Sequence, residues 1–177
     1  MNFKFFESLI KKEAQEYLDE FLLFGKGRGI KILQENLHFT IDTDFNIESL
    51  SSILKALTPI LKTTPCEPDL SLPEFIRNTD SYKKNLFDFD EQSKSIVLAA
   101  AYYLGETFVR TFEQLSWATG NTNYAEGNMP VVTTFKHNIE MAPILIAENM
   151  FGGVISGMRP INSIDTAIEG WKGDVPE

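Results

Sequence analysis

The feature that most constrains this fold is a helical pattern that leads directly into a two-stranded ribbon. From Asp90 to Phe112, apolar residues recur three or four positions apart, which is the spacing of one face of an α-helix. A polar hairpin follows, with short strand-like runs over 115–119 and 130–135 on either side of Gly120 and Asn121. A long helix followed directly by a two-stranded ribbon predicts a structural module. This pattern contains no catalytic motif.

The remaining periodicity predicts a helix-rich chain. Helical patterns cover 3–24, 47–61, 141–154 and 163–171, and a short helix fits 71–80. The glycine-rich run 25–29 is expected to end the first helix, with Gly25 as its C-cap. Residues 30–41 alternate well enough for one or two short strands. Asp90 and either Asp44 or Asn46 are the expected N-caps of the central helix and of the 47–61 helix.

We therefore predict an α+β fold: a helix-rich single domain over residues 1–177, with a small antiparallel sheet at the 115–135 hairpin. The segment 63–73 holds three prolines and predicts a connection. It separates an N-terminal helical segment, 1–62, from an α+β segment, 74–177. Each piece is short for independent stability, which favours one domain with a long surface connection.

The net charge of −9 is unevenly distributed along the chain. Residues 86–177 hold five basic and twelve acidic residues, a net of −7, whereas residues 1–31 are close to neutral. Such a negative field repels nucleic acid and anionic lipid and attracts basic partners. With no membrane-spanning apolar run and no secretory leader at its start, the chain is expected to be cytoplasmic.

Several chemistries are disfavoured by the residues present. The single Cys66 excludes a disulfide framework, and the two histidines, His38 and His137, are too few and too far apart for a zinc site. The 25–29 run lacks the strand and the Gly-Lys-Ser/Thr ending of a phosphate loop. No cofactor, metal, nucleic-acid or membrane partner is therefore expected.

Glu106 is the carboxylate with the most distinctive sequence context. Its neighbour Gly105 lies mid-helix, where a glycine costs roughly 1 kcal/mol against alanine, which points to the close approach of another segment. A carboxylate near Trp117 could be desolvated and act as an acid. The competing expectations are an ion pair with Arg110, four residues on, and a hydrogen bond to the indole or to hairpin amides.

The candidate binding residues are Glu106, Trp117, Tyr124, Glu126 and Glu140. Trp117 is expected to pack the ribbon on the central helix, and Tyr124 beside Glu126 places an aromatic at a polar hairpin tip, where it suits a partner anchor. The run His137-Asn-Ile-Glu140 can bring an imidazole and a carboxylate together.

The run Tyr102-Tyr-Leu-Gly105-Glu106-Thr-Phe108, then Trp117, then Pro130 to Phe135 and Pro143, resembles several small uncharacterised bacterial families. These place a Gly-Glu helix before a Trp-bearing hairpin and a closing helix. The resemblance covers roughly residues 90–155 and supplies no catalytic residues. Some proteins of this kind are immunity partners of bacterial toxins, so the resemblance implies an immunity-type role.

These observations favour a non-enzymatic cytosolic binding protein of immunity type, whose acidic surface covers a basic toxin. One alternative is a small hydrolase or transferase that uses Glu106, His137 and Glu140, which requires these groups to converge on one substrate. The other is a structural module that forms homo-oligomers through the aromatic hairpin tip and the tail helix.

Overall fold

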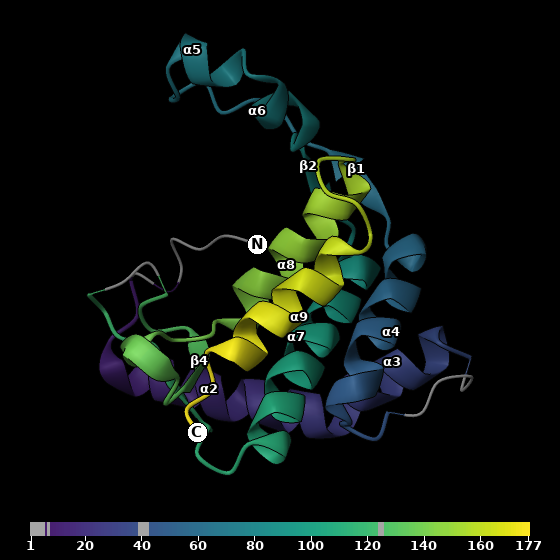
Figure 1. The fold of residues 1–177 in the computed structure, drawn as a ribbon. Coiled ribbons are helices and arrows are strands. Elements are labelled where there is room, and N and C mark those ends of the chain that lie inside the picture. The colour runs from purple at the N-terminus through teal and green to yellow at the C-terminus, as the bar shows by residue number, and fades with distance from the viewer. Residues whose placement is uncertain (1–5, 7, 39–42, 124–125) are drawn as a thin grey trace.

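The computed structural model describes residues 6, 8–38, 43–123 and 126–177. It shows an α+β fold in which helices surround one central helix and two small antiparallel sheets lie at the edges (Figure 1). The predicted fold class is confirmed. Among the described helices, none combines the length and the apolar composition needed to cross a membrane.

Helix α7 (Glu91–Thr111) is the centre of the molecule. It begins where expected, because the Asp90 side chain accepts a 2.7 Å hydrogen bond from the Ser93 amide. Its middle stretch, 99–108, is buried on all sides, since α8 (Pro143–Ile155), α3 (Ile30–Asn36) and α4 (Ile47–Leu57) all contact it. Helix α9 (Ser163–Gly173) covers α4 from outside.

The N-terminal helix does not stop at Gly25, so the predicted C-cap is wrong. Helix α2 (Lys11–Phe24) continues through a π-helical turn, η1 (Gly25–Gly29), into α3. The glycine instead makes room, because a Cβ on Gly25 would lie 2.0 Å from the Tyr102 ring of α7. Of the predicted 30–41 strands, residues 30–36 are likewise helical and residues 37–38 form a turn; residues 39–42 lie outside the described residues.

Other boundaries also differ from the sequence predictions, beginning with helix α2, which starts at Lys11 and not near residue 3. The 71–80 helix is two short helices, α5 (Glu74–Arg77) and α6 (Asp80–Lys84). Helix α8 includes Gly152 and Gly153 and ends at Ile155. Helix α4 is capped by Asn46 as expected, and Pro59 lies in a closing 3-10 turn, η2 (Thr58–Ile60).

The predicted ribbon is present as β3 (Ser116–Thr119) and β4 (Pro130–Thr133), which pair antiparallel with Trp117 opposite Val132. After β4 the chain forms a short 3-10 turn, η3 (Lys136–Asn138), and returns to β4 at Met141. Two backbone hydrogen bonds of 2.8 and 2.9 Å between Val132 and Met141 close this excursion. Residues 133–140 thus form a closed loop, called here the η3 loop.

A second sheet was not predicted. Strand β1 (Thr63–Pro65) pairs with β2 (Phe87–Phe89), so the proline-rich segment begins as a strand and not as a free connection. Residues 66–86 between these strands project from the helical body as an arm that carries α5 and α6 (Figure 1).

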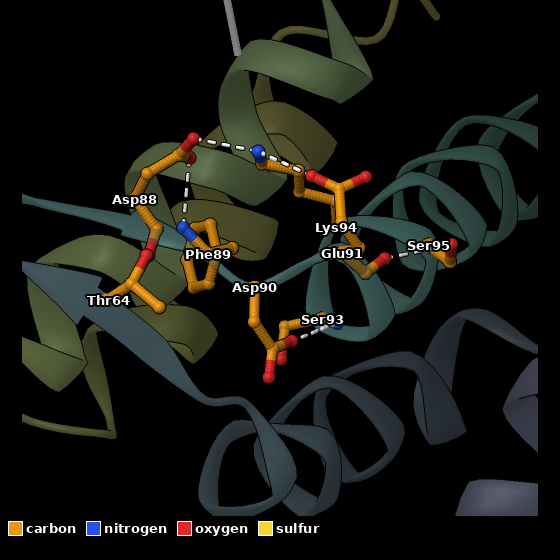
Figure 2. Close-up of polar contacts among 8 residues, drawn as sticks. All are labelled: Thr64, Asp88, Phe89, Asp90, Glu91, Ser93, Lys94 and Ser95. Atoms are coloured by element: carbon orange, nitrogen blue, oxygen red, sulfur yellow. Dashed lines mark hydrogen bonds and ion pairs between the residues drawn. The ribbon is translucent and has the colours of Figure 1, made fainter.

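The stem of this arm is joined to the start of α7 by a charged contact. Lys94 Nζ lies 2.8 Å from Asp88 Oδ2 on β2 and 3.0 Å from Glu91 Oε1 (Figure 2). Burial alone would raise the pKa of Asp88, but the hydrogen bond from Lys94 and its positive charge hold that pKa below the ordinary value. The two carboxylates correspondingly raise the pKa of Lys94.

Candidate functional site

The predicted site residues fall into two separate groups. Glu106 and Trp117 meet at the junction between α7 and the ribbon. Glu126 and Glu140 line a cavity together with His137. Tyr124 lies outside the described residues.

Glu106 has both of its oxygens occupied. Its Oε1 accepts a 2.8 Å hydrogen bond from Arg110 Nε, and its Oε2 accepts a 3.0 Å hydrogen bond from the Trp117 indole. Both structural expectations from the sequence, the ion pair and the indole contact, are therefore present. The Arg110 guanidinium carbon lies 3.8 Å from the centroid of the Phe45 ring, which adds a cation–π contact that the sequence pattern did not reveal.

The surroundings of Glu106 are those of a packed core. The indole of Trp117 lies over Gly105, and a Cβ on that glycine would be 2.2 Å from the ring. Gly105 therefore permits the close approach of a side chain from the ribbon. Tyr102 is fully buried, and its ring lies parallel to that of Trp117. Burial, followed by the negative charge of Glu106, raises the pKa of Tyr102 to about 12.

We predict that Glu106→Ala destabilises the protein by about 1–3 kcal/mol, because it leaves the Trp117 N–H and the Arg110 guanidinium without an acceptor. The half-exposed Arg110 keeps the effect below that of breaking a fully buried pair. Urea unfolding followed by circular dichroism measures it. Glu113→Ala is the matched control, since Glu113 is exposed two residues after α7. Equal stability of the two variants would contradict a structural role for Glu106.

The second group lies in a cavity of about 360 Å³ formed by Glu126, His137, Asn138, Ile139 and Glu140. Four of these residues belong to the η3 loop, and Glu126 comes from the turn between β3 and β4. Glu106 is not among the lining residues. The structure therefore does not bring Glu106 together with His137 and Glu140, as the enzymatic alternative requires.

Specific contacts position the two carboxylates. Glu140 Oε2 accepts a 2.9 Å hydrogen bond from the Asn121 amide, which ties the η3 loop to the hairpin turn. Gly120 lets the backbone of Glu126 come close, because a Cβ on Gly120 would lie 2.1 Å from the Glu126 carbonyl oxygen. The buried Asn128 side chain then anchors the turn by donating 3.0 Å hydrogen bonds to the carbonyls of Phe6 and Leu9.

The η3 loop is held in an uncommon backbone conformation. Thr134, His137 and Asn138 have φ angles of 76°, 59° and 56°, in the left-handed region that residues other than glycine seldom adopt. Such conformations persist where the surrounding structure enforces them, and they cluster at functional sites. Here the Val132–Met141 bridge holds the two ends of the loop together. A 2.8 Å hydrogen bond from the Lys136 amide to the Asp174 carbonyl ties the middle of the loop to the tail.

The chemistry of this cavity suits a cationic side chain. Two half-buried carboxylates offer acceptors for an ammonium or guanidinium group, and Ile139, 36% exposed, offers apolar surface for its aliphatic stem. Among the described residues, no group of three or more His, Cys, Asp or Glu side chains is arranged to hold a metal ion. Sequence reasoning named Glu126 and Glu140 separately; their convergence depends on the bridge that closes the η3 loop.

Comparisons with protein-family models, with curated proteins and with solved structures give no match for this chain. The resemblance to small bacterial families over roughly residues 90–155 stays a prediction.

Proposed function

We propose that this protein is a non-enzymatic binding protein whose acidic surface covers a basic surface of a partner protein. The partner is a basic toxin, and the role is that of an immunity-type inhibitor in the bacterial cytoplasm. The proposal rests on the position of the acidic residues that form no ion pair within the described structure.

Ion pairing within the described residues removes much of the charge of the C-terminal half from consideration. Five of its twelve acidic residues lie within 4.0 Å of a lysine or arginine nitrogen: Asp88, Glu91, Glu106, Asp165 and Glu169. These pairs occur on β2, α7 and α9, so on those surfaces the negative charge of the acidic residues is locally balanced by lysine or arginine. Electrostatic attraction of a partner depends on the charge that is left.

Five acidic residues without an ion pair in the described structure lie on four segments that contact one another in turn: the hairpin turn, the η3 loop, the tail and the end of α7. Glu126 and Glu140 line the cavity, and Glu113 follows α7. The side chain of Gln114 donates a hydrogen bond of 2.6 Å to the Pro176 carbonyl, which brings the tail with Asp174 and Glu177 beside the end of α7. The Lys136 amide bonds to Asp174, so the η3 loop adjoins the same tail. We call this surface the acidic end.

The acidic end and its cavity together suit a basic protein. The surface charge attracts a cationic partner over a distance, and the cavity receives one arginine or lysine side chain between Glu126 and Glu140. A basic toxin would be blocked by coverage alone, so this role needs no reaction chemistry. Both oxygens of Glu106 already accept hydrogen bonds, and Glu106 does not line the cavity. These two facts favour this proposal over the hydrolase or transferase alternative.

The test uses a fluorescently labelled octa-arginine peptide, whose binding is followed by fluorescence anisotropy at increasing salt. Between about 0.01 M and about 0.15 M salt the Debye length falls from about 30 Å to about 8 Å, so the affinity should fall steeply. An uncharged Gly-Ser peptide of the same length is the control and should not bind. An affinity that is independent of salt, or binding of the control peptide, would contradict the proposed electrostatic mechanism.

A further inference from the structure

The arm formed by residues 66–86 is an ordered projection. The amide of Cys66 donates a 3.0 Å hydrogen bond to the Leu86 carbonyl, which closes the arm at its stem. Further out, the Asp69 amide donates a 2.7 Å hydrogen bond to the Tyr82 hydroxyl, and Arg77 Nε donates a 3.0 Å hydrogen bond to the Leu72 carbonyl. These contacts fix the segment that leads into the arm, residues 66–73, to its two short helices. The arm extends away from the helical body as one piece (Figure 1).

The outer part of the arm exposes large apolar side chains. Leu70 is 78% exposed and Phe75, on α5, is 75% exposed, which makes them the two most exposed large hydrophobic residues in the described structure. None of the elements that the structure describes covers them. Aromatic residues presented on a rigid projection are typical anchors of protein interfaces, since they bury much area and lose little conformational entropy.

A cavity of about 360 Å³ lies at the foot of the same arm. Its lining is mixed: five residues are apolar or glycine, among them Phe87, Phe89, Gly152 and Met158, and five are polar or charged, among them Glu148 and Arg159. It lies where the arm meets α8 and the turn that follows α8, in which the Met158 sulfur lies 3.1 Å from Asn85 Nδ2. The two phenylalanines and Met158 provide apolar walls, and Gly152 leaves one side open: an added Cβ there would meet only Phe87, at 3.9 Å. A cavity of this size accepts an aromatic side chain.

The geometry points to a second copy of this chain as the partner of both surfaces. Helix α5, which carries Phe75, lies at the outer end of the extended arm (Figure 1), so Phe75 cannot occupy the cavity at the foot of its own arm. Two arms that lie side by side in opposite directions place each outer end at the foot of the other. This arrangement is a twofold, self-complementary interface, in which one patch serves both subunits.

The charges along the arm support this antiparallel arrangement. Glu74 is exposed next to Phe75 at the outer end. Near the foot, α6 exposes Lys83 and Lys84, and the exposed Arg159 lines the cavity together with two acidic residues, Glu148 and Asp88, of which Asp88 is already paired with Lys94. An antiparallel pair therefore sets the acidic side chain of one arm against basic side chains of the other, whereas a parallel pair would set like charges together. We propose that the chain forms a reciprocal dimer in which Phe75 of each subunit enters the arm-foot cavity of the other.

Sedimentation equilibrium over a range of concentrations tests this dimer. The unchanged chain should show a reversible monomer–dimer equilibrium. Phe75→Ser should raise the dimer dissociation constant at least about tenfold, because it removes the central aromatic anchor. Gly152→Leu should do the same from the other side by filling the cavity. Leu23→Ser is the matched control, since Leu23 is 74% exposed on α2, away from the arm, and should leave the equilibrium unchanged.

A charge exchange separates this arrangement from other modes of association. Glu74→Lys alone and Lys83→Glu with Lys84→Glu should each weaken the dimer, and all three changes together should restore it. Circular dichroism checks that each variant is folded. A chain that stays monomeric at concentrations up to about 1 mM would overturn the proposal, because its dimer dissociation constant would then be weaker than about 1 mM. So would a dimer that Phe75→Ser leaves intact, or one that Leu23→Ser weakens equally.

Discussion

Gly25→Ala should be among the most damaging single-methyl changes in this protein. The added Cβ would lie 2.0, 2.1 and 2.6 Å from three ring carbons of Tyr102, far inside van der Waals contact. Tyr102 cannot give way easily, because it is fully buried and its ring lies parallel to Trp117. Overpacking of a dense core typically costs about 1–3 kcal/mol and occasionally more, and this contact places the cost at or above the top of that range.

Gly27→Ala is the control, since it makes the same chemical change two residues away in the same π-helical turn. Nothing lies within 4 Å of a Cβ at Gly27. There the substitution should stabilise the protein by about 0.5–1 kcal/mol, because alanine loses less backbone entropy in a helix than glycine does. Urea unfolding of the two variants measures the difference. Similar stabilities for Gly25→Ala and Gly27→Ala would show that the packing of η1 on α7 described above is wrong.

The misinterpretation of this glycine shows where sequence reasoning stopped. Gly-x-Gly-x-Gly after a helical pattern predicts a helix end, since glycine is the usual residue past the last turn. Here the chain stays helical through η1. The deciding fact is the approach of Tyr102, 77 positions further along the chain, which no local pattern contains. The predicted strands at 30–41 fail for the same reason, because the helix continues and buries Leu33 and Leu37 in the core.

Elements with strong local signals could be predicted well. The 3.6-residue spacing together with the Asp90 cap located α7. Of the two caps expected for α4, Asp44 or Asn46, the structure has Asn46, and the 141–154 pattern located α8 to within two residues. The ribbon followed from alternation around a polar turn. The β1–β2 stem could not be predicted, since it has three residues in each strand and pairs segments 24 positions apart. Short strands with distant partners leave little periodic signal.

The candidate site could be predicted in its parts but not in its arrangement. The partners of Glu106 followed from helical spacing, because Arg110 lies four residues on. The convergence of Glu126 and Glu140 depends on the long-range bridge between Val132 and Met141, and on left-handed backbone at His137 and Asn138. Non-glycine residues in that conformation are not recognisable from their identity alone. The charge sum of the C-terminal half likewise says nothing about which carboxylates are paired.

If the acidic end has the proposed role, a cationic partner must bind there. Two double charge-reversal variants test the location of binding. The first variant, Glu126→Lys with Glu140→Lys, reverses the two cavity carboxylates. The second, Glu35→Lys with Glu67→Lys, reverses two exposed acidic residues on α3 and on the arm, so the net charge of the two proteins is the same. Any difference between them therefore reports the location of binding and not the overall charge.

The dissociation constant of octa-arginine for these two variants is the most direct measurement. Reversal of the cavity pair should weaken binding at least about tenfold, because two carboxylate contacts are replaced by repulsion. Reversal of the control pair should change the affinity by less than about threefold, through the general field alone. Equal losses in the two variants, or a greater loss in the control, would contradict the claim that the acidic end and its cavity form the binding surface.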